Sequence, residues 1–172
     1  KKFCRLLPCR LPCRLPWPLR QPLLPGLPLL AVGLASKTAV KEKFYRFLTM
    51  IPDVDAELDI FWAEHFGNVN RWYLERRRPD DIIISASPEF LLRLPADKLG
   101  VRLIASRVGK YTGIYEGANN DGEEKVRRLR REYPGTEIRE FFSDSANDTP
   151  LAGLAERAWM VSGSTLRPWP KK

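Results

Sequence analysis

Three short segments of the chain hold residues of the types that bind a phosphate group and a metal ion. Two of the segments follow apolar runs, at residues 82–84 and 141–142, and the third lies near the start of a strongly charged run. The residues concerned are Ser85, Ala86, Lys125, Asp144 and Asp148. Polar residues that follow strands are placed where α/β proteins build their binding sites. The segments are therefore expected to lie close together in the fold.

The combination of these residue types favours phosphoryl transfer. Asp144 and Asp148 lie four residues apart in one predicted loop and can hold a hydrated Mg²⁺, directly or through water. The metal ion neutralises phosphate charge and orients the group for attack. Lys125 adds a positive charge beside a phosphate oxygen. Ser85 donates through its hydroxyl, and the neighbouring backbone at Ala86 donates through its N–H group.

Each residue taken alone also has a purely structural interpretation. A serine such as Ser87, directly before Pro88, is typical of a helix cap. Lys125 would then be a solvated helix residue, and the two aspartates would be turn or capping residues. The order of the three segments along one chain favours the functional interpretation.

Hydrophobic spacing predicts helices first and an alternation of strands and helices afterwards. The expected helices lie at residues 36–48, 54–66, 69–77, 88–94, 121–133 and 149–156, the strands at 82–86, 101–108, 137–143 and 158–162, and a hairpin at 111–117. The dense aromatic residues of the first helices are expected to form a small core of their own. Alternating elements with short loops predict an α/β fold with a mainly parallel sheet.

Two features of the helical stretch resemble catalytic elements but have simpler interpretations. Asp53 and Asp55 form an acidic pair, but they follow Pro52 and a helix rather than a strand. We interpret them as an inter-helix turn in which Asp53 caps the next helix, as Ser36 is expected to cap the first one. No serine, cysteine or metal-ligand residue lies at a spacing from His65 that would indicate catalysis or metal binding. His65 is therefore interpreted as a packing residue.

The three segments resemble motifs two, three and four of the haloacid dehalogenase (HAD) superfamily of aspartate-nucleophile phosphatases, and most closely its phosphoserine-phosphatase-like branch. Ser85 matches the second motif, and Lys125 in Asn-Asp-Gly-Glu-Glu-Lys matches the third. Residues 143–148, Ser-Asp-Ser-Ala-Asn-Asp, match the fourth, with Ser143 in place of the usual Gly. The resemblance implies hydrolysis of a small phosphorylated metabolite with Mg²⁺ as the cofactor.

The resemblance covers about residues 36–170 and implies a HAD-like Rossmannoid parallel sheet with a small helical cap. Residues 36–78 correspond to the cap, and residues 79–172 to a partial phosphatase core. The family's first motif, a strand followed by Asp-x-Asp-x-Thr, supplies the nucleophile and the general acid. No Asp or Glu precedes Glu42, so no nucleophile is assigned. The expected consequences are a fragment of low stability, without its first central strand, and a chain inactive in hydrolysis. The alternative is a catalytically dead phosphate-ligand-binding or regulatory module.

Residues 1–35 have a character of their own. They hold all three cysteines and the repeated unit Cys-Arg-Leu-Pro, which neither a long helix nor a central strand accommodates. We interpret this irregular tail as a reading-frame or gene-start artefact. An export signal and a basic interaction tail are the alternatives.

The location of the charge argues against a nucleic-acid or membrane partner. The formal net charge is +8, but six of the 29 basic residues and none of the 21 acidic ones lie in residues 1–35. The rest of the chain is therefore nearly neutral, whereas nucleic-acid binding needs a basic face. With the tail set aside, the remainder has no cysteine and no export signal, so a cytoplasmic location is expected. The oligomeric state and the identity of the substrate stay open.

Overall fold

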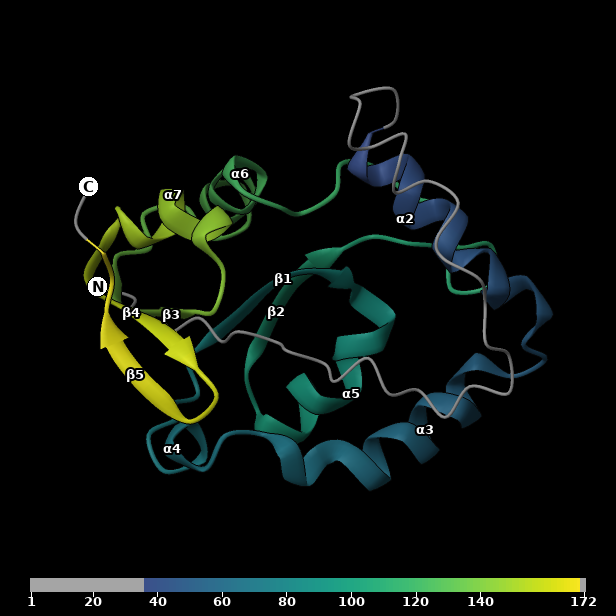
Figure 1. Ribbon diagram of the computed structural model, residues 1–172, viewed down its shortest axis with the longest axis horizontal. Coiled ribbons are helices and arrows are strands. Elements are labelled where there is room, and N and C mark those ends of the chain that lie inside the picture. The colour runs from purple at the N-terminus through teal and green to yellow at the C-terminus, as the bar shows by residue number, and fades with distance from the viewer. Residues whose placement is uncertain (1–35, 171–172) are drawn as a thin grey trace.

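The computed structural model of the protein describes residues 36–170, and this described part begins with helices (Figure 1). They are α2 (Lys37–Tyr45), α3 (Val54–His65) and α4 (Arg71–Leu74), with 3-10 turns η1 (Arg46–Met50) and η2 (Phe66–Asn68). The side chains of Ser36 and Asp53 accept hydrogen bonds from the first turns of α2 and α3, which confirms the predicted caps. Helix α4 is shorter than the predicted 69–77.

Strands and helices alternate from residue 82 onward, as the sequence predicts. The elements are β1 (Ile82–Pro88), α5 (Glu89–Leu99), β2 (Arg102–Ser106), α6 (Glu123–Glu132), β3 (Ile138–Ser143), η3 (Ala146–Asp148), α7 (Thr149–Ala152), β4 (Ala155–Ser162) and β5 (Thr165–Pro168). Strands β1 and β2 pair in parallel, as do β3 and β4, while β4 and β5 are antiparallel. The predicted α/β fold with mainly parallel pairing is thus confirmed.

The boundaries of α5 differ from the prediction because the helix continues through Pro95 to Leu99. A proline inside a helix leaves the carbonyl four residues earlier without its usual N–H partner. In this protein that carbonyl belongs to Leu91, and the indole N–H of Trp62 donates to it at 2.7 Å. A side chain of α3 therefore supplies the hydrogen bond that Pro95 removes.

Two further differences lie near the end of the chain. The predicted helix 149–156 is wrong in its last part, because α7 ends at Ala152 and Ala155 already pairs with Ile138 in the sheet. Strand β5 was not predicted. It forms a hairpin with β4 through a two-residue turn that includes Gly163, whose φ is +59°.

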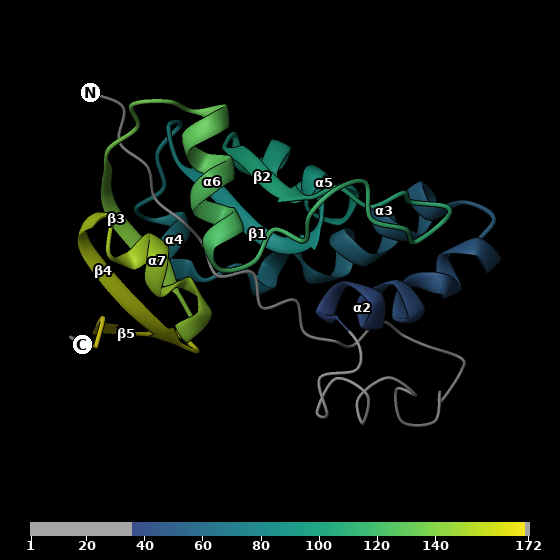
Figure 2. The same ribbon diagram turned by 90° about the horizontal axis from the view of Figure 1, so that it is seen from above.

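Strands β1 and β2 alternate their side chains between two covered faces, with α6 and α7 on one side and α3 and α5 on the other (Figure 1, and from above in Figure 2). Ile82, Ile84 and Ile104 lie in one buried cluster with apolar side chains of α6 and α7. Ile83 and Leu103 point the other way, into a cluster with α3 and α5. This explains why β1 is apolar throughout, since both of its faces are covered.

The aromatic residues of the helical region do not form a separate core, contrary to expectation. Phe61, Trp62 and Tyr73 are buried in the same cluster as Ile83 and Leu92 of the β1–α5 unit. A strand face and a helix thus complete the burial that three short helices could not achieve among themselves.

Within residues 36–170 the strands form two separate ladders, β1–β2 and β3–β4–β5. Side chains rather than backbone hydrogen bonds join them. Ile84 of β1 and Phe141 of β3 share one buried cluster. The carboxyl ends of β1 and β3 are thereby brought near each other.

Candidate functional site

A pocket of about 280 Å³ lies at the carboxyl ends of β1 and β3. It is lined by Lys41, Tyr45, Ile84, Ser85, Ala86, Ser87, Asp121, Lys125, Ser143, Asp144, Ser145 and Asp148. All five residues singled out in the sequence are in this lining. The structure therefore brings together three segments that are up to 63 residues apart, from Ser85 to Asp148.

A chain of two short hydrogen bonds crosses the floor of the pocket. The ammonium group of Lys125 donates to Asp148 Oδ1 at 2.5 Å, and the hydroxyl of Ser143 donates to Asp148 Oδ2 at 2.6 Å. All three residues are buried. Asp148 thus holds Lys125 in one orientation, and Ser143, which occupies the glycine position of the motif, helps to hold Asp148.

Ser85 is buried in β1, directly after the regular pairing with β2 ends at Ile84, and both its side chain and its carbonyl are hydrogen-bonded. Its Oγ accepts the backbone N–H of Ser87 at 3.1 Å, and its carbonyl accepts the side-chain N–H of Asn120 at 2.9 Å. Asn120 also donates to the carbonyl of Ile104 at 3.1 Å, so it ties the ends of β1 and β2 together. The hydroxyl proton of Ser85 has no acceptor among the described residues and can be donated to a ligand.

The interpretation of Ser87 as a helix cap is wrong. Pro88 occupies the N-cap position of α5, and no side chain caps that helix. The backbone N–H of Ser87 instead points back to Ser85 and completes a tight turn at the pocket edge.

The acidic residues of the pocket fit part of a magnesium site. Mg²⁺ in proteins is commonly bound by one or two carboxylates, with water and substrate phosphate oxygens as the other ligands. Asp144 is half-buried in the pocket lining, next to Ser143, and Asp148 is the second carboxylate. No group of three or more His, Cys, Asp or Glu residues is clustered within residues 36–170. Such a site would need the phosphate itself to complete it.

Helix α2 contributes a residue that sequence reasoning did not identify. The ammonium group of Lys41 reaches from this helix to the carbonyl of Ala86 at 3.2 Å and to Asn119 Oδ1 at 3.0 Å. Burial lowers the pKa of Lys41. Nothing in the local sequence distinguishes this lysine from its neighbours on the helix, because only the packing of α2 over the sheet end brings it to the pocket.

The segment between β2 and α6, which we call the flap (residues 107–121), holds α2 in place. The backbone N–H of Tyr115 donates to Glu42 at 3.0 Å, and Lys37 forms an ion pair with Asp121 at 3.3 Å. At Gly113 a Cβ atom would lie 2.5 Å from the carbonyl oxygen of Tyr45, so only glycine permits this approach. Figure 1 shows the flap running beside α2.

The residues interpreted as structural lie outside this pocket. Asp53 caps α3, and Asp55 forms an ion pair with Lys110 of the flap. The imidazole of His65 is bonded through Nδ1 to the carbonyl of Phe61 at 2.8 Å and stacks on the Phe61 ring. These interpretations are confirmed.

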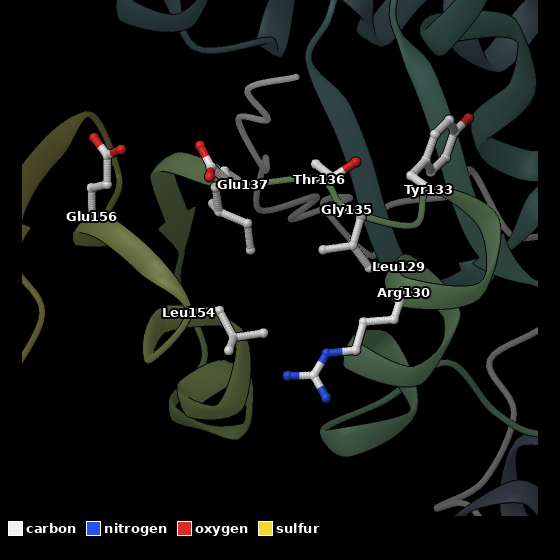
Figure 3. A pocket seen from close by; sticks show the side chains of 9 residues that line it. Leu129, Arg130, Tyr133, Gly135, Thr136, Glu137, Leu154 and Glu156 are labelled. Carbon is white, nitrogen blue, oxygen red and sulfur yellow. The ribbon is translucent and has the colours of Figure 1, made fainter. Parts of the chain in front are cut away.

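A second pocket, of about 430 Å³, lies at the start of β3, the opposite end from the first (Figure 3). Its lining includes Arg130, Glu137, Leu154 and Glu156. None of the residues predicted to bind phosphate or metal is in this lining. It therefore serves as a reference region, remote from the candidate site.

A comparison with protein families shows to which family the chain belongs. The model of haloacid dehalogenase-like hydrolases matches residues 5–153. The chain belongs to the haloacid dehalogenase-like hydrolase family. The match begins inside residues 1–35, which lie outside the described residues, and continues through all three motif segments.

A solved structure has a similar fold. It is that of a protein with unknown function from Bordetella pertussis Tohama I, 24% identical, with a TM-score of 0.58, and the similarity covers 76% of this chain and 68% of that chain. A search of curated proteins found no match. Membership of the HAD family supports a hydrolase-type activity. No helix among residues 36–170 is long and apolar enough to cross a bilayer.

Proposed function

We propose that the pocket at the ends of β1 and β3 binds a small phosphomonoester together with Mg²⁺, as in a HAD phosphatase of the phosphoserine-phosphatase-like branch. The supporting observation is the buried Lys125–Asp148–Ser143 chain, which lines one pocket together with Ser85 of β1. A lysine held in this way presents a fixed positive charge to a phosphate oxygen.

Each residue of the pocket has a definite part in this proposal. The hydroxyl of Ser85 and the N–H of Ala86 donate hydrogen bonds to the phosphate, and Lys125 pairs with another of its oxygens. Asp144 holds Mg²⁺ directly, and Asp148 reaches the ion through water because Lys125 and Ser143 occupy both of its oxygens. The ion supplies charge neutralisation and orientation when it is bound.

The charges around the pocket balance such a ligand. Two lysines and three aspartates line it, and Lys37 pairs with one of those aspartates from outside. The group is therefore close to neutral on its own. A divalent cation and a phosphomonoester dianion would enter together without leaving an uncompensated charge in the pocket.

Hydrolysis by the aspartyl-phosphate route needs a carboxylate nucleophile, and this chain offers none in the motif position. No acidic residue precedes Glu42. The carboxylates of the pocket lining have other roles, since Asp121 pairs with Lys37, Asp148 holds Lys125, and Asp144 is assigned to the metal. We therefore expect the chain to bind phosphomonoesters without turning them over, which is the behaviour of a phosphate-binding module.

The test combines calorimetry with a phosphate-release assay on the full chain. Inorganic phosphate should bind when Mg²⁺ is present, and a panel of small phosphomonoesters should release no phosphate. Lys125→Met should weaken binding at least about tenfold, the loss of one charge-assisted hydrogen bond, whereas Arg130→Ala in the remote pocket should leave it unchanged.

The possible results separate the alternatives. Turnover that is lost in both Lys125→Met and Asp144→Asn would mean that the chain is an active phosphatase with an unrecognised nucleophile. Phosphate binding that does not respond to either substitution would contradict the proposed site altogether.

A further inference from the structure

Ser143 occupies the position at which the fourth motif usually has glycine, and its hydroxyl is used both as a donor and as an acceptor. The residue is the last of β3 and is 2% exposed. Its hydroxyl donates to Asp148 Oδ2 at 2.6 Å and accepts the backbone N–H of Ser145 at 3.1 Å. Glycine at this position could make neither contact. Serine therefore adds a fixed hydrogen-bond donor to the second aspartate of the motif.

The backbone at Ser143 does not require glycine. Ser143 pairs with Met160 as part of the parallel β3–β4 ladder, and no residue other than glycine has a positive φ between residues 36 and 170. Glycine is favoured where φ is positive, which is not the case here. The effect of serine in place of glycine therefore lies in its side chain, and a substitution by alanine leaves the strand conformation accessible.

Asp148 has a hydrogen-bond partner on each of its carboxylate oxygens. Lys125 donates to Oδ1 at 2.5 Å and Ser143 donates to Oδ2. All three residues are buried, and hydrogen bonds to a buried carboxylate are short and strong. A cation that coordinates Asp148 directly competes with the hydroxyl of Ser143 and lies beside the ammonium group of Lys125. Both effects lower the affinity of this carboxylate for a metal ion.

The other carboxylates of the pocket lining do not compensate for this loss. Asp144 is assigned to the ion, and Asp121 is paired with Lys37 at 3.3 Å. Mg²⁺ gives up its water reluctantly and is commonly held by one or two carboxylates together with phosphate oxygens of the substrate. Phosphate oxygens then supply the ligands that Asp148 does not offer directly.

We propose that Ser143 keeps the affinity of the pocket for Mg²⁺ alone low, so that the ion binds well only together with phosphate. This inference rests on the proposed function and adds how occupancy of that same site is regulated. Ser143 is a positioning residue that acts through Asp148. The coupling between the two ligands is reciprocal, so Mg²⁺ tightens phosphate binding by the same factor by which phosphate tightens Mg²⁺ binding.

Calorimetry on the full chain tests this with Mg²⁺ alone, inorganic phosphate alone, and each ligand in the presence of a saturating amount of the other. In the unmodified chain, phosphate should tighten Mg²⁺ binding at least about tenfold. Ser143→Ala removes the competing hydroxyl and should bind Mg²⁺ alone at least about tenfold more tightly than the unmodified chain, which is the value of one hydrogen bond to a charged group. The coupling factor should shrink accordingly.

Two further variants separate the hydroxyl of Ser143 from other effects. Ser143→Thr keeps a hydroxyl on a residue type that strands favour, and it should keep the weak binding of Mg²⁺ alone. Thr136→Val is the matched control, because it removes a buried hydroxyl without a hydrogen-bond partner among the described residues, in the remote pocket. It should leave all affinities unchanged. Mere damage to the pocket would weaken Mg²⁺ binding, whereas the expected effect of Ser143→Ala is a gain.

If Ser143→Ala does not fold, Ser143→Gly, which restores the usual residue of the motif, replaces it. If neither variant folds, the affinities of the unmodified chain for Mg²⁺ with and without phosphate decide alone.

Two kinds of negative result have different meanings. Equal affinity of the unmodified chain for Mg²⁺ with and without phosphate, or no gain in Ser143→Ala, would overturn the role of Ser143 while the phosphate site stands. A gain that Ser143→Thr shares would overturn it as well. If inorganic phosphate does not bind even with Mg²⁺ present, the proposed function fails and this inference fails with it.

Discussion

Lys125 and Asp148 form a buried ion pair whose value to the protein can be measured directly. Their side chains are 9% and 7% exposed. Removing one partner of such a pair leaves an uncompensated buried charge, whereas removing both does not. We expect Lys125→Met to lower the free energy of unfolding by about 3 kcal/mol, and the double variant with Asp148→Asn to recover most of that loss.

Chemical denaturation of the two single variants and the double variant gives the coupling energy. Asp148→Asn alone should also destabilise, because it leaves Lys125 without its counter-charge. If the losses of the two single variants add up to the loss of the double variant, the two residues are not coupled and the ion pair does not hold the pocket floor together. In that case Lys125→Met would weaken phosphate binding only by removing the positive charge, and not by disturbing the structure of the pocket.

At the scale of the elements, helix α3 supplies a hydrogen bond that helix α5 lacks. The indole N–H of Trp62 donates to the carbonyl that Pro95 leaves without a helical partner. Trp62→Phe removes this donor while keeping an aromatic ring, and the buried carbonyl is then unsatisfied. We expect a loss of about 1–3 kcal/mol in the free energy of unfolding, measured by urea denaturation.

Trp72 offers the matched control for this prediction. It is half-buried whereas Trp62 is buried, and its indole N–H is buried without a hydrogen-bond partner among the described residues. Trp72→Phe therefore loses no hydrogen bond and should cost less than Trp62→Phe. Equal losses in the two variants would show that ring volume, and not the bond to Leu91, is what matters at Trp62.

At the scale of the whole molecule, we expect the contact between the two strand ladders to limit stability. Among residues 36–170, β1 pairs with β2 in one ladder, and β3, β4 and β5 form the other. Apolar side chains of β1, β3, α6 and α7 join the ladders. No strand among residues 36–170 joins β1 to β3, so within that part of the chain the contact between the ladders depends on these side chains.

We therefore expect a free energy of unfolding at or below about 5 kcal/mol for the full chain without ligand, the low end for proteins of this size. Mg²⁺ with phosphate should raise it, by about 2.7 kcal/mol at a hundredfold excess over the dissociation constant, because the pocket exists only in the folded state and a ligand that binds it stabilises that state. Urea denaturation followed by circular dichroism measures both values. A steep, cooperative transition near 10 kcal/mol without ligand would contradict this expectation.

The sequence alone determined most of the elements and the motif residues, because both depend on local signals, whereas strand β5 was missed. The apolar run before Ser85 and the helical spacing around Lys125 are readable without a structure. So are the caps at Ser36 and Asp53, since the signal lies within one helical turn. The boundaries failed where a distant residue intervened, at Pro95 through Trp62 and at Ala155 through Ile138.

Only the tertiary structure decided how the pocket is completed. Ser143 as the partner of Asp148, Asn120 as the tie between β1 and β2, and Lys41 as the cation over Ala86 have no local signature. Each acts through a contact with a residue that is close in space, and for Asn120 and Lys41 that residue is far away in the chain. Such contacts arise when layers pack, which periodicity within one segment does not encode.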